Sequence, residues 1–191
     1  MASYRQMIQA QLTLAEGGVI AYPTEAVYGY GCDPFNESAV VRLLDIKARP
    51  WQKGLILIAA NMAQLAPLLV PLTVHQQQQL RDSWPGPVTW LIPDPGHWVP
   101  QWVKGEHDAV AVRVCGHPLA RRLCEQWGGP IVSTSANRSG ETPCYSELPL
   151  RLRLQRLPLC CQPDVIVGGA TLGLQNPSVI CDLSTGKIIR A

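Results

Sequence analysis

The sequence predicts an α/β fold, a single domain over residues 1–191 in which one twisted, mixed sheet is flanked by helices. Short apolar segments of strand length are interspersed with longer segments whose apolar residues recur at helical spacing. Several strands follow one another directly and the chain ends in a hairpin, so the sheet must hold both parallel and antiparallel neighbours. A length of 191 residues with 47% hydrophobic residues is enough for a full core without metal or disulfide support.

Helices are expected where caps and breakers frame the helical spacing. Ser3 caps the first helix, which ends at Gly17-Gly18. Asn36 caps the second, which runs to about Lys47. The other helices are expected at Met62–Leu69, Val74–Arg81, Pro118–Trp127 and Ser146–Leu157.

Strands are expected where short apolar or alternating runs are bounded by turn residues. They are Val19–Tyr22, Leu55–Ile58, Val88–Ile92, Ala109–Val114, Ile131–Ser133, Val165–Val167, Ser178–Leu183 and Lys187–Arg190. The segment Pro23–Gly31 is expected to be a site loop leading into a further strand, because its glycines allow close backbone approach. The stretch Pro93–Gly105 has no period and is expected to be a surface loop that covers the site.

Composition narrows the class of protein. Sixteen Lys and Arg against fourteen Asp and Glu give a formal charge of +2, less than a protein needs to hold nucleic acid by charge alone. Seven cysteines form an odd number and include the adjacent pair Cys160-Cys161, which predicts reduced thiols in a cytoplasmic protein. The N-terminus has no signal pattern, and the longest apolar run, Leu55–Ala60, is too short to cross a bilayer.

Most standard catalytic motifs are missing. The chain has no G-x-x-x-x-G-K-[ST] phosphate loop, no H-E-x-x-H and no G-x-S-x-G. The histidines are scattered without ligand spacing, at positions His75, His97, His107 and His117. We therefore expect no metal site made by the protein alone.

Two polar clusters are candidates for anion binding. The first, Lys47 to Lys53, holds three cations in seven residues just past a helix end, and could neutralise a polyphosphate. The alternative is that Lys47 complements the helix dipole and the other cations are solvated. The second cluster, Ser133–Gly140, places hydroxyls, an amide and a guanidinium directly after a strand, as phosphate- and carboxylate-binding loops do, although such turns also occur without function.

Two further elements carry polar groups in unusual places. Arg113 lies in an alternating apolar strand, where a charge is costly unless it faces a cleft or an anion; the alternative is a charge that protects an edge strand. The final hairpin could bring Ser178 and Arg190 to the same surface. Together the clusters suggest a pocket that works by positioning and charge neutralisation, as in nucleotidyl transfer.

The order of these motifs resembles the YrdC family. The motifs are Val19–Glu25, Lys47-x-Arg49 with Lys53, Ala111–Val114 followed by His117-Pro118, and Ser133-x-Ser135-Ala136-Asn137-x-Ser139-Gly140. The resemblance covers nearly the whole chain, and the length and the segment Glu25–Gly29 are similar to the short bacterial TsaC branch.

The resemblance implies an open sheet with a positively lined face. It further implies synthesis of threonylcarbamoyl-AMP from L-threonine, bicarbonate or CO2 and ATP, with Mg²⁺ arriving on the ATP. The product would pass to a separate transferase complex like that of TsaB, TsaD and TsaE, which modifies the adenosine beside the anticodon of tRNA. Weak binding of tRNA itself would fit this pathway.

The resemblance also assigns site residues. Lys47 and Arg49 match the family's basic pair and are expected to be catalytic. The residues expected to bind ATP are Lys47, Arg49, Lys53, Asn137 and Arg190. Those expected to bind threonine are Thr24, Arg113, Ser135 and Ser178.

Two departures and two rival functions stay open at this point. Many longer relatives have Thr where Ala26 stands and His where Ile58 stands, and they carry an additional C-terminal domain. Closure over the ligands is therefore expected to rely on loops such as Pro93–Gly105. The rivals are an RNA-binding maturation factor and a carbamoyl-transferring enzyme of hydrogenase maturation, whose additional modules this sequence does not contain.

Overall fold

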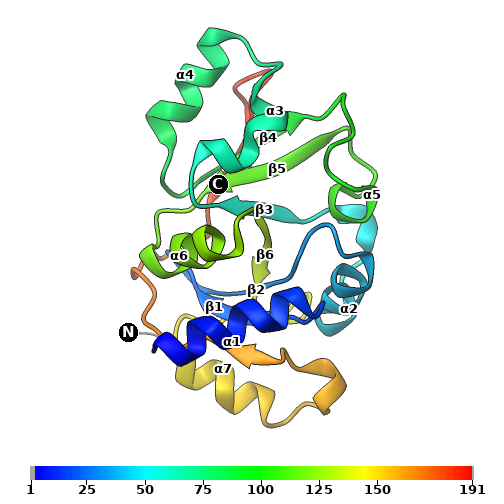
Figure 1. Ribbon diagram of the computed structural model, residues 1–191, viewed down its shortest axis with the longest axis vertical. Helices are drawn as coiled ribbons and strands as arrows, with labels where there is room; N and C mark the ends of the chain where they lie inside the picture. Colours follow the sequence, from blue (N-terminus) through cyan, green and yellow to red (C-terminus); the bar gives the residue numbers. More distant parts are fainter. Residues whose placement is uncertain (1–2, 191) are drawn as a thin grey trace.

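The strands of the sheet are short. A computed structural model describes residues 3–190, and its strands are β1 (Ile20–Pro23), β2 (Tyr28–Gly31), β3 (Ile56–Ala59), β4 (Val88–Pro93), β5 (Ala109–Val114), β6 (Ile131–Ser135), β7 (Val165–Ile166), β8 (Val179–Asp182) and β9 (Ile188–Arg190). All of them belong to one sheet, in the order β7-β1-β2-β6-β3-β5-β4-β8-β9 (Figure 1). The pairs β1–β7, β3–β5 and β4–β8 are parallel and the others antiparallel, which confirms the predicted mixed sheet.

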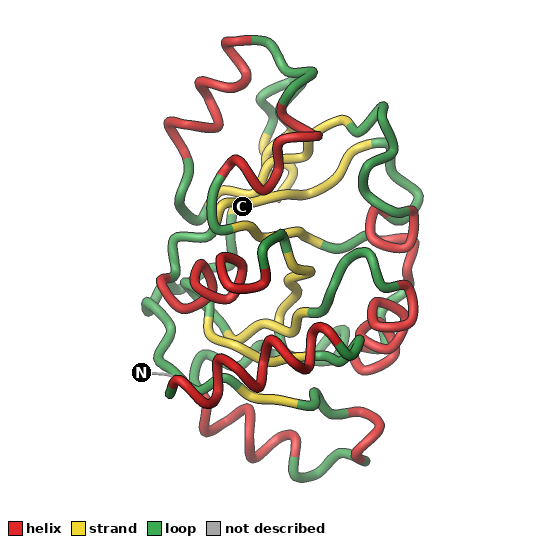
Figure 2. Tube along the Cα trace, in the orientation of Figure 1, coloured by secondary structure: helices red, strands yellow, loops and turns green. Residues whose placement is uncertain are grey.

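Helices surround this sheet, as the tube in Figure 2 shows. They are α1 (Tyr4–Ala15), α2 (Glu37–Lys47), α3 (Ala66–Leu69), α4 (Val74–Ser83), α5 (Gln101–Lys104), α6 (Pro118–Trp127) and α7 (Glu147–Leu154). Short 3-10 turns occur at Trp51–Lys53, Met62–Leu65 and Leu159–Cys161.

Apolar side chains join helices to sheet in two clusters. α1 and α6 lie in front of the sheet in Figure 1, and their Leu14 and Leu123 share one cluster with Ile58 of β3. The larger cluster includes Leu43 of α2 and Val112 of β5. Burial of these side chains, worth about 1.5–3 kcal/mol each, stabilises the sheet as the support for the polar residues at its strand ends.

The helix caps follow the sequence. Ser3 forms a capping box with Gln6, and the Asn36 side chain accepts from the Ala39 amide. His117 caps α6, since its Nδ1 accepts from the amides of the first turn. The predicted helix starts are confirmed at all three places.

Two predictions, one of a loop and one of a helix, are wrong in part. The stretch Pro93–Gly105 contains α5 and buries Val99 and Val103, because the Asp94 carboxylate accepts from two amides and pairs with the buried Lys104 ammonium at 3.0 Å. The predicted helix Met62–Leu69 is a 3-10 turn followed by α3.

Residues 167–178 connect β7 at one edge of the sheet to β8 near the other, and therefore cross the sheet without regular structure. We call them the crossing segment. The Gly169 amide donates to the Tyr28 hydroxyl, the His117 ring bonds to the Ala170 carbonyl at 2.9 Å, and the Leu174 amide donates to the Glu25 carbonyl.

Two further observations concern the helices and the cysteines. No helix within residues 3–190 combines the length and apolar character needed to span a membrane. The seven cysteines carry free thiols, four of them buried.

Candidate functional site

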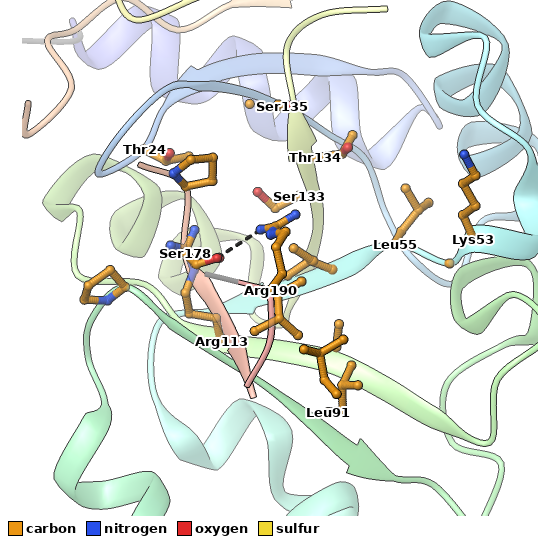
Figure 3. Close-up of a pocket in the computed structure, with 18 of the residues that line it drawn as sticks. Thr24, Lys53, Leu55, Leu91, Arg113, Ser133, Thr134, Ser135, Ser178 and Arg190 are labelled. Carbon is orange, nitrogen blue, oxygen red and sulfur yellow. Dashed lines mark hydrogen bonds between the residues drawn. The ribbon is translucent and has the colours of Figure 1, made fainter. Parts of the chain in front are cut away.

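A cavity of about 660 Å³ opens where distant segments of the chain meet. Its walls come from the β1–β2 turn, the segment after α2, the strands β5 and β6, the crossing segment and the final hairpin. Seven of the nine site residues predicted from the sequence line it, namely Thr24, Arg49, Lys53, Arg113, Ser135, Ser178 and Arg190. Figure 3 shows Lys53 on the opposite side of the cavity from Thr24, Ser178 and Arg113, with Arg190 between them.

Arg113 forms a buried ion pair at one end of the cavity. Its guanidinium lies 3.3 Å from Glu25 Oε2, and the two side chains are 8% and 3% exposed. The Gly116 amide donates to Glu25 Oε1 at 2.8 Å, and the Cys115 thiol donates to Oε2. Because β5 lies between β3 and β4 in the sheet, the reading of Arg113 as an edge-strand charge is wrong.

Lys104, which also lines the cavity, is paired with Asp94, but three other cavity cations have no such partner. Among residues 3–190, no carboxylate lies within 4.0 Å of the side chains of Arg49, Lys53 or Arg190. Arg49 donates to the Gly54 carbonyl at 2.9 Å, and Arg190 to the Ser178 carbonyl at 3.0 Å. Burial, and then repulsion from Arg190, lowers the pKa of Arg49; burial, and then repulsion from Arg113, lowers the pKa of Arg190. This end of the cavity therefore favours an anion.

Hydroxyl groups line much of the remaining cavity wall. Ser133, Thr134 and Ser135 come from β6, which extends two residues further than predicted. The Thr24 hydroxyl donates to the Val27 carbonyl at 2.7 Å, which leaves its oxygen lone pairs free to accept from a ligand. Ser178 shares a hydrogen bond of 2.8 Å with the buried Thr89 hydroxyl.

Lys47 and Asn137 are the two predicted site residues that do not line the cavity. Lys47 is 3% exposed, and its ammonium donates to the carbonyls of Ser135 and Asn137 behind the β6 wall. Burial, followed by repulsion from Arg49, lowers the pKa of Lys47 to about 8. The two residues are nevertheless next to the segment that carries Arg49, so the basic and Ser-x-Asn motifs do come together in space.

Several cavity residues were not predicted from the sequence. Glu25 carried a signal, because it stands inside a motif of the site loop. Glu106, His107 and Asp108 follow α5, and Leu174 lies in the crossing segment; neither stretch has a period or motif that marks it.

The two departures from longer relatives have different surroundings. Ala26 lines the cavity, so its smaller side chain changes the wall there. Ile58 is fully buried in the cluster beneath α1 and α6 and is not part of the lining.

Among residues 3–190, His, Cys, Asp and Glu side chains do not gather in threes in a way that could hold a metal ion.

Comparison with known proteins identifies close relatives. A family model labelled Sua5_yciO_yrdC and described as Telomere recombination matches residues 13–191. The protein named Threonylcarbamoyl-AMP synthase of Pseudomonas aeruginosa strain UCBPP-PA14 is 50% identical over 190 residues, covering 100% of this chain and 98% of its own.

Solved structures share the fold. P. abyssi Sua5 complexed with L-threonine superposes with a TM-score of 0.82 and 31% identity, over 97% of this chain and 52% of that one, so this chain spans about half its length. E. coli YciO has a TM-score of 0.82 and 26% identity, over 98% of this chain and 89% of that one.

Proposed function

The chain belongs to the Sua5/YciO/YrdC family, and from that membership and the geometry of the cavity we propose that it is a threonylcarbamoyl-AMP synthase. L-Threonine, bicarbonate and ATP would give threonylcarbamoyl-AMP, pyrophosphate and water. The observation that carries the proposal is one cavity that holds three cations without carboxylate partners, a buried Arg–Glu pair and several hydroxyl groups. Its volume of about 660 Å³ is within the range of roughly 300–1,000 Å³ typical of small-molecule sites.

ATP would lie with its phosphates at Arg49, Lys53 and Arg190, which line the cavity. A guanidinium can hold two phosphate oxygens at once, and a phosphate would relieve the repulsion between the two arginines. The other two predicted ATP residues, Lys47 and Asn137, would support the site from behind its wall.

L-Threonine would lie at the opposite end, with its carboxylate on Arg113 and its polar groups near Thr24, Ser135 and Ser178. The apolar side chains of Ala26 and Val27 beside Thr24 would receive its methyl group. Burial of one methyl group contributes only about 1–3 kcal/mol of discrimination between threonine and serine, so we expect slow turnover of L-serine. If labelled L-serine gave no adduct at all, this assignment of the methyl pocket would be refuted.

The reaction needs positioning and charge stabilisation. The threonine amine and bicarbonate would form a carbamate with loss of water, and a carbamate oxygen would attack the α-phosphorus as the bond to pyrophosphate breaks. Arg49, Lys53 and Arg190 would stabilise the charge that gathers on the phosphates. Mg²⁺ would enter as part of the ATP substrate, bound to its phosphates, and would further neutralise them.

The proposal also covers the fate of the product and the place of the reaction in the cell. The adenylate would be consumed by a transferase complex like TsaB, TsaD and TsaE that modifies tRNA, in the cytoplasm where ATP and tRNA are present. RNA binding as the main activity is not favoured, since the formal charge is only +2 and the full-length relative is named a synthase.

Labelled bicarbonate provides the test. The purified protein, incubated with ATP, L-threonine and [¹⁴C]bicarbonate, should form a labelled adenylate together with pyrophosphate, and no label should appear when threonine or ATP is omitted. Consumption of ATP without a labelled adenylate would overturn the proposal.

A further inference from the structure

Lys47 links the end of α2 to the loop after β6. Its ammonium donates to the carbonyls of Ser135 and of Asn137, the latter at 2.7 Å. In the opposite direction, the Ser139 amide donates to the Lys47 carbonyl at 2.8 Å. These bonds tie the loop of residues 135–139, which we call the β6 loop, to the helix at three backbone positions.

The β6 loop is also closed from within. The Asn137 side-chain amide donates to the carbonyls of Arg138 and Glu141, at 2.9 and 2.7 Å, and the Ala136 amide donates to the Tyr28 carbonyl. Asn137 and Ala136 are buried, whereas Ser135 is half-buried and lines the cavity. The back of the loop is thus held by several bonds to protein, although Asn137 Oδ1 is buried without a hydrogen-bond partner, and Ser135 is the residue of the loop that lines the cavity.

A buried ammonium is costly unless its N–H groups are bonded, and the carbonyls of Ser135 and Asn137 satisfy two of the three. The chain turns sharply just after Lys47, because Ala48 has a left-handed backbone with φ of 48°. This turn sends Arg49 into the cavity wall and leaves Lys47 behind it.

We propose that Lys47 is a positioning residue, which holds the β6 loop so that the Ser135 hydroxyl is presented to the substrate, and that it does not itself contact ATP. The consequence for turnover rests on the proposed function, whereas the consequence for the loop does not. A displacement of about 1 Å in a substrate-positioning group can cost about 10²-fold in rate.

Hydrogen exchange without any substrate tests the loop. In Lys47→Met, the amides of residues 135–139 should exchange at least about tenfold faster than in the wild type, because bonds to a charged donor are lost. The matched control is Lys53→Met, a cavity lysine six residues further on, in which exchange of the β6 loop should stay at the wild-type rate. Wild-type exchange in Lys47→Met would overturn the proposal even if the protein makes no adenylate.

Kinetics of adenylate formation test the second part of the proposal, that Lys47 acts through Ser135 and does not contact ATP. Lys47→Met should reproduce the pattern of Ser135→Ala, with the same substrate showing the raised KM, and the double variant should be little worse than either single one. A pattern like that of Lys53→Met, with weakened ATP binding that adds to the effect of Ser135→Ala, would show that Lys47 is a phosphate ligand.

Lysine labelling of the wild-type protein tests the same proposal without a variant, and so applies even if Lys47→Met does not fold. With an acylating reagent and mass spectrometry, Lys53 should react in the free protein and become protected by ATP. Lys47 should stay unreactive in both states. Reaction of Lys47 in the free protein, with protection by ATP, would contradict the proposal.

Discussion

The arginines of the cavity differ in whether a carboxylate balances their charge. At one end Arg113 is paired with Glu25, and both are buried. Elsewhere in the cavity, Arg49 and Arg190 have backbone carbonyls as their hydrogen-bond acceptors, and repulsion contributes to lowering the pKa of each. The difference teaches that the cations of one site have separate tasks: Arg113, paired with Glu25, supports the fold as well as the proposed threonine site, whereas an uncompensated arginine serves the anion alone.

The largest effect should come from breaking the paired end. Arg113→Met leaves the Glu25 carboxylate buried without an opposite charge, so the free energy of unfolding should fall by about 3–5 kcal/mol in urea denaturation at neutral pH. Adding Glu25→Gln should recover much of the loss. A loss below about 1 kcal/mol would show that the pair does not stabilise the fold.

The uncompensated end should respond in rate more than in stability. Arg49→Met should slow adenylate formation by about 10²-fold or more, because a group that stabilises the developing phosphate charge is lost. Its free energy of unfolding should change by less than about 1.5 kcal/mol, the scale of a hydrogen bond. Arg5→Met on the exposed face of α1 is the control, and an Arg49 variant as fast as this control would contradict the assignment.

Behind the wall, Lys47 should make stability depend on alkaline pH. Its pKa is about 8 in the folded protein and near 10.5 when unfolded, so between these values the unfolded state binds more protons and stability rises with pH. The free energy of unfolding of the wild type minus that of Lys47→Met should increase by about 1 kcal/mol from pH 8 to pH 9. The subtraction removes the thiols and tyrosines, which titrate in both proteins; a difference that does not change with pH would contradict a lowered pKa.

The smallest effect concerns the turn that separates Lys47 from Arg49. Ala48 has φ of 48°, so Ala48→Gly should relieve backbone strain and raise the free energy of unfolding by about 0.5 kcal/mol, after the greater entropy of the unfolded glycine is counted. Gly128→Ala, at a helix end with φ of 84°, is the opposite control and should lower it. Destabilisation by Ala48→Gly would show that the turn is not strained. Thermal unfolding by circular dichroism provides both values.

Much of the site could be predicted because its polar residues stand at positions where the sequence alone makes them unusual. A guanidinium within an alternating apolar strand and a run of hydroxyls after a strand are costly or distinctive in any fold, and both Arg113 and Ser135 do line the cavity. The helix caps and the final hairpin were equally predictable, since they depend on a few neighbouring residues.

What could not be predicted depends on distant pairing or on single backbone angles. Glu25 and Arg113 are far apart in the sequence, and no local pattern pairs them. Lys47 and Arg49 stand in one motif and were assigned together, yet the left-handed Ala48 gives them different surroundings. The crossing segment supplies part of the cavity wall without any period that marks it, because its position is set by the two strands it joins.

A crystal structure with a non-hydrolysable ATP analogue and L-threonine tests the central claim most directly. We predict phosphate oxygens within hydrogen-bond distance of Arg49 and Arg190, the threonine carboxylate on Arg113, and the Lys47 ammonium still bonded to the β6 loop. A triphosphate on Arg113, or a nucleotide bound outside the cavity, would contradict the account.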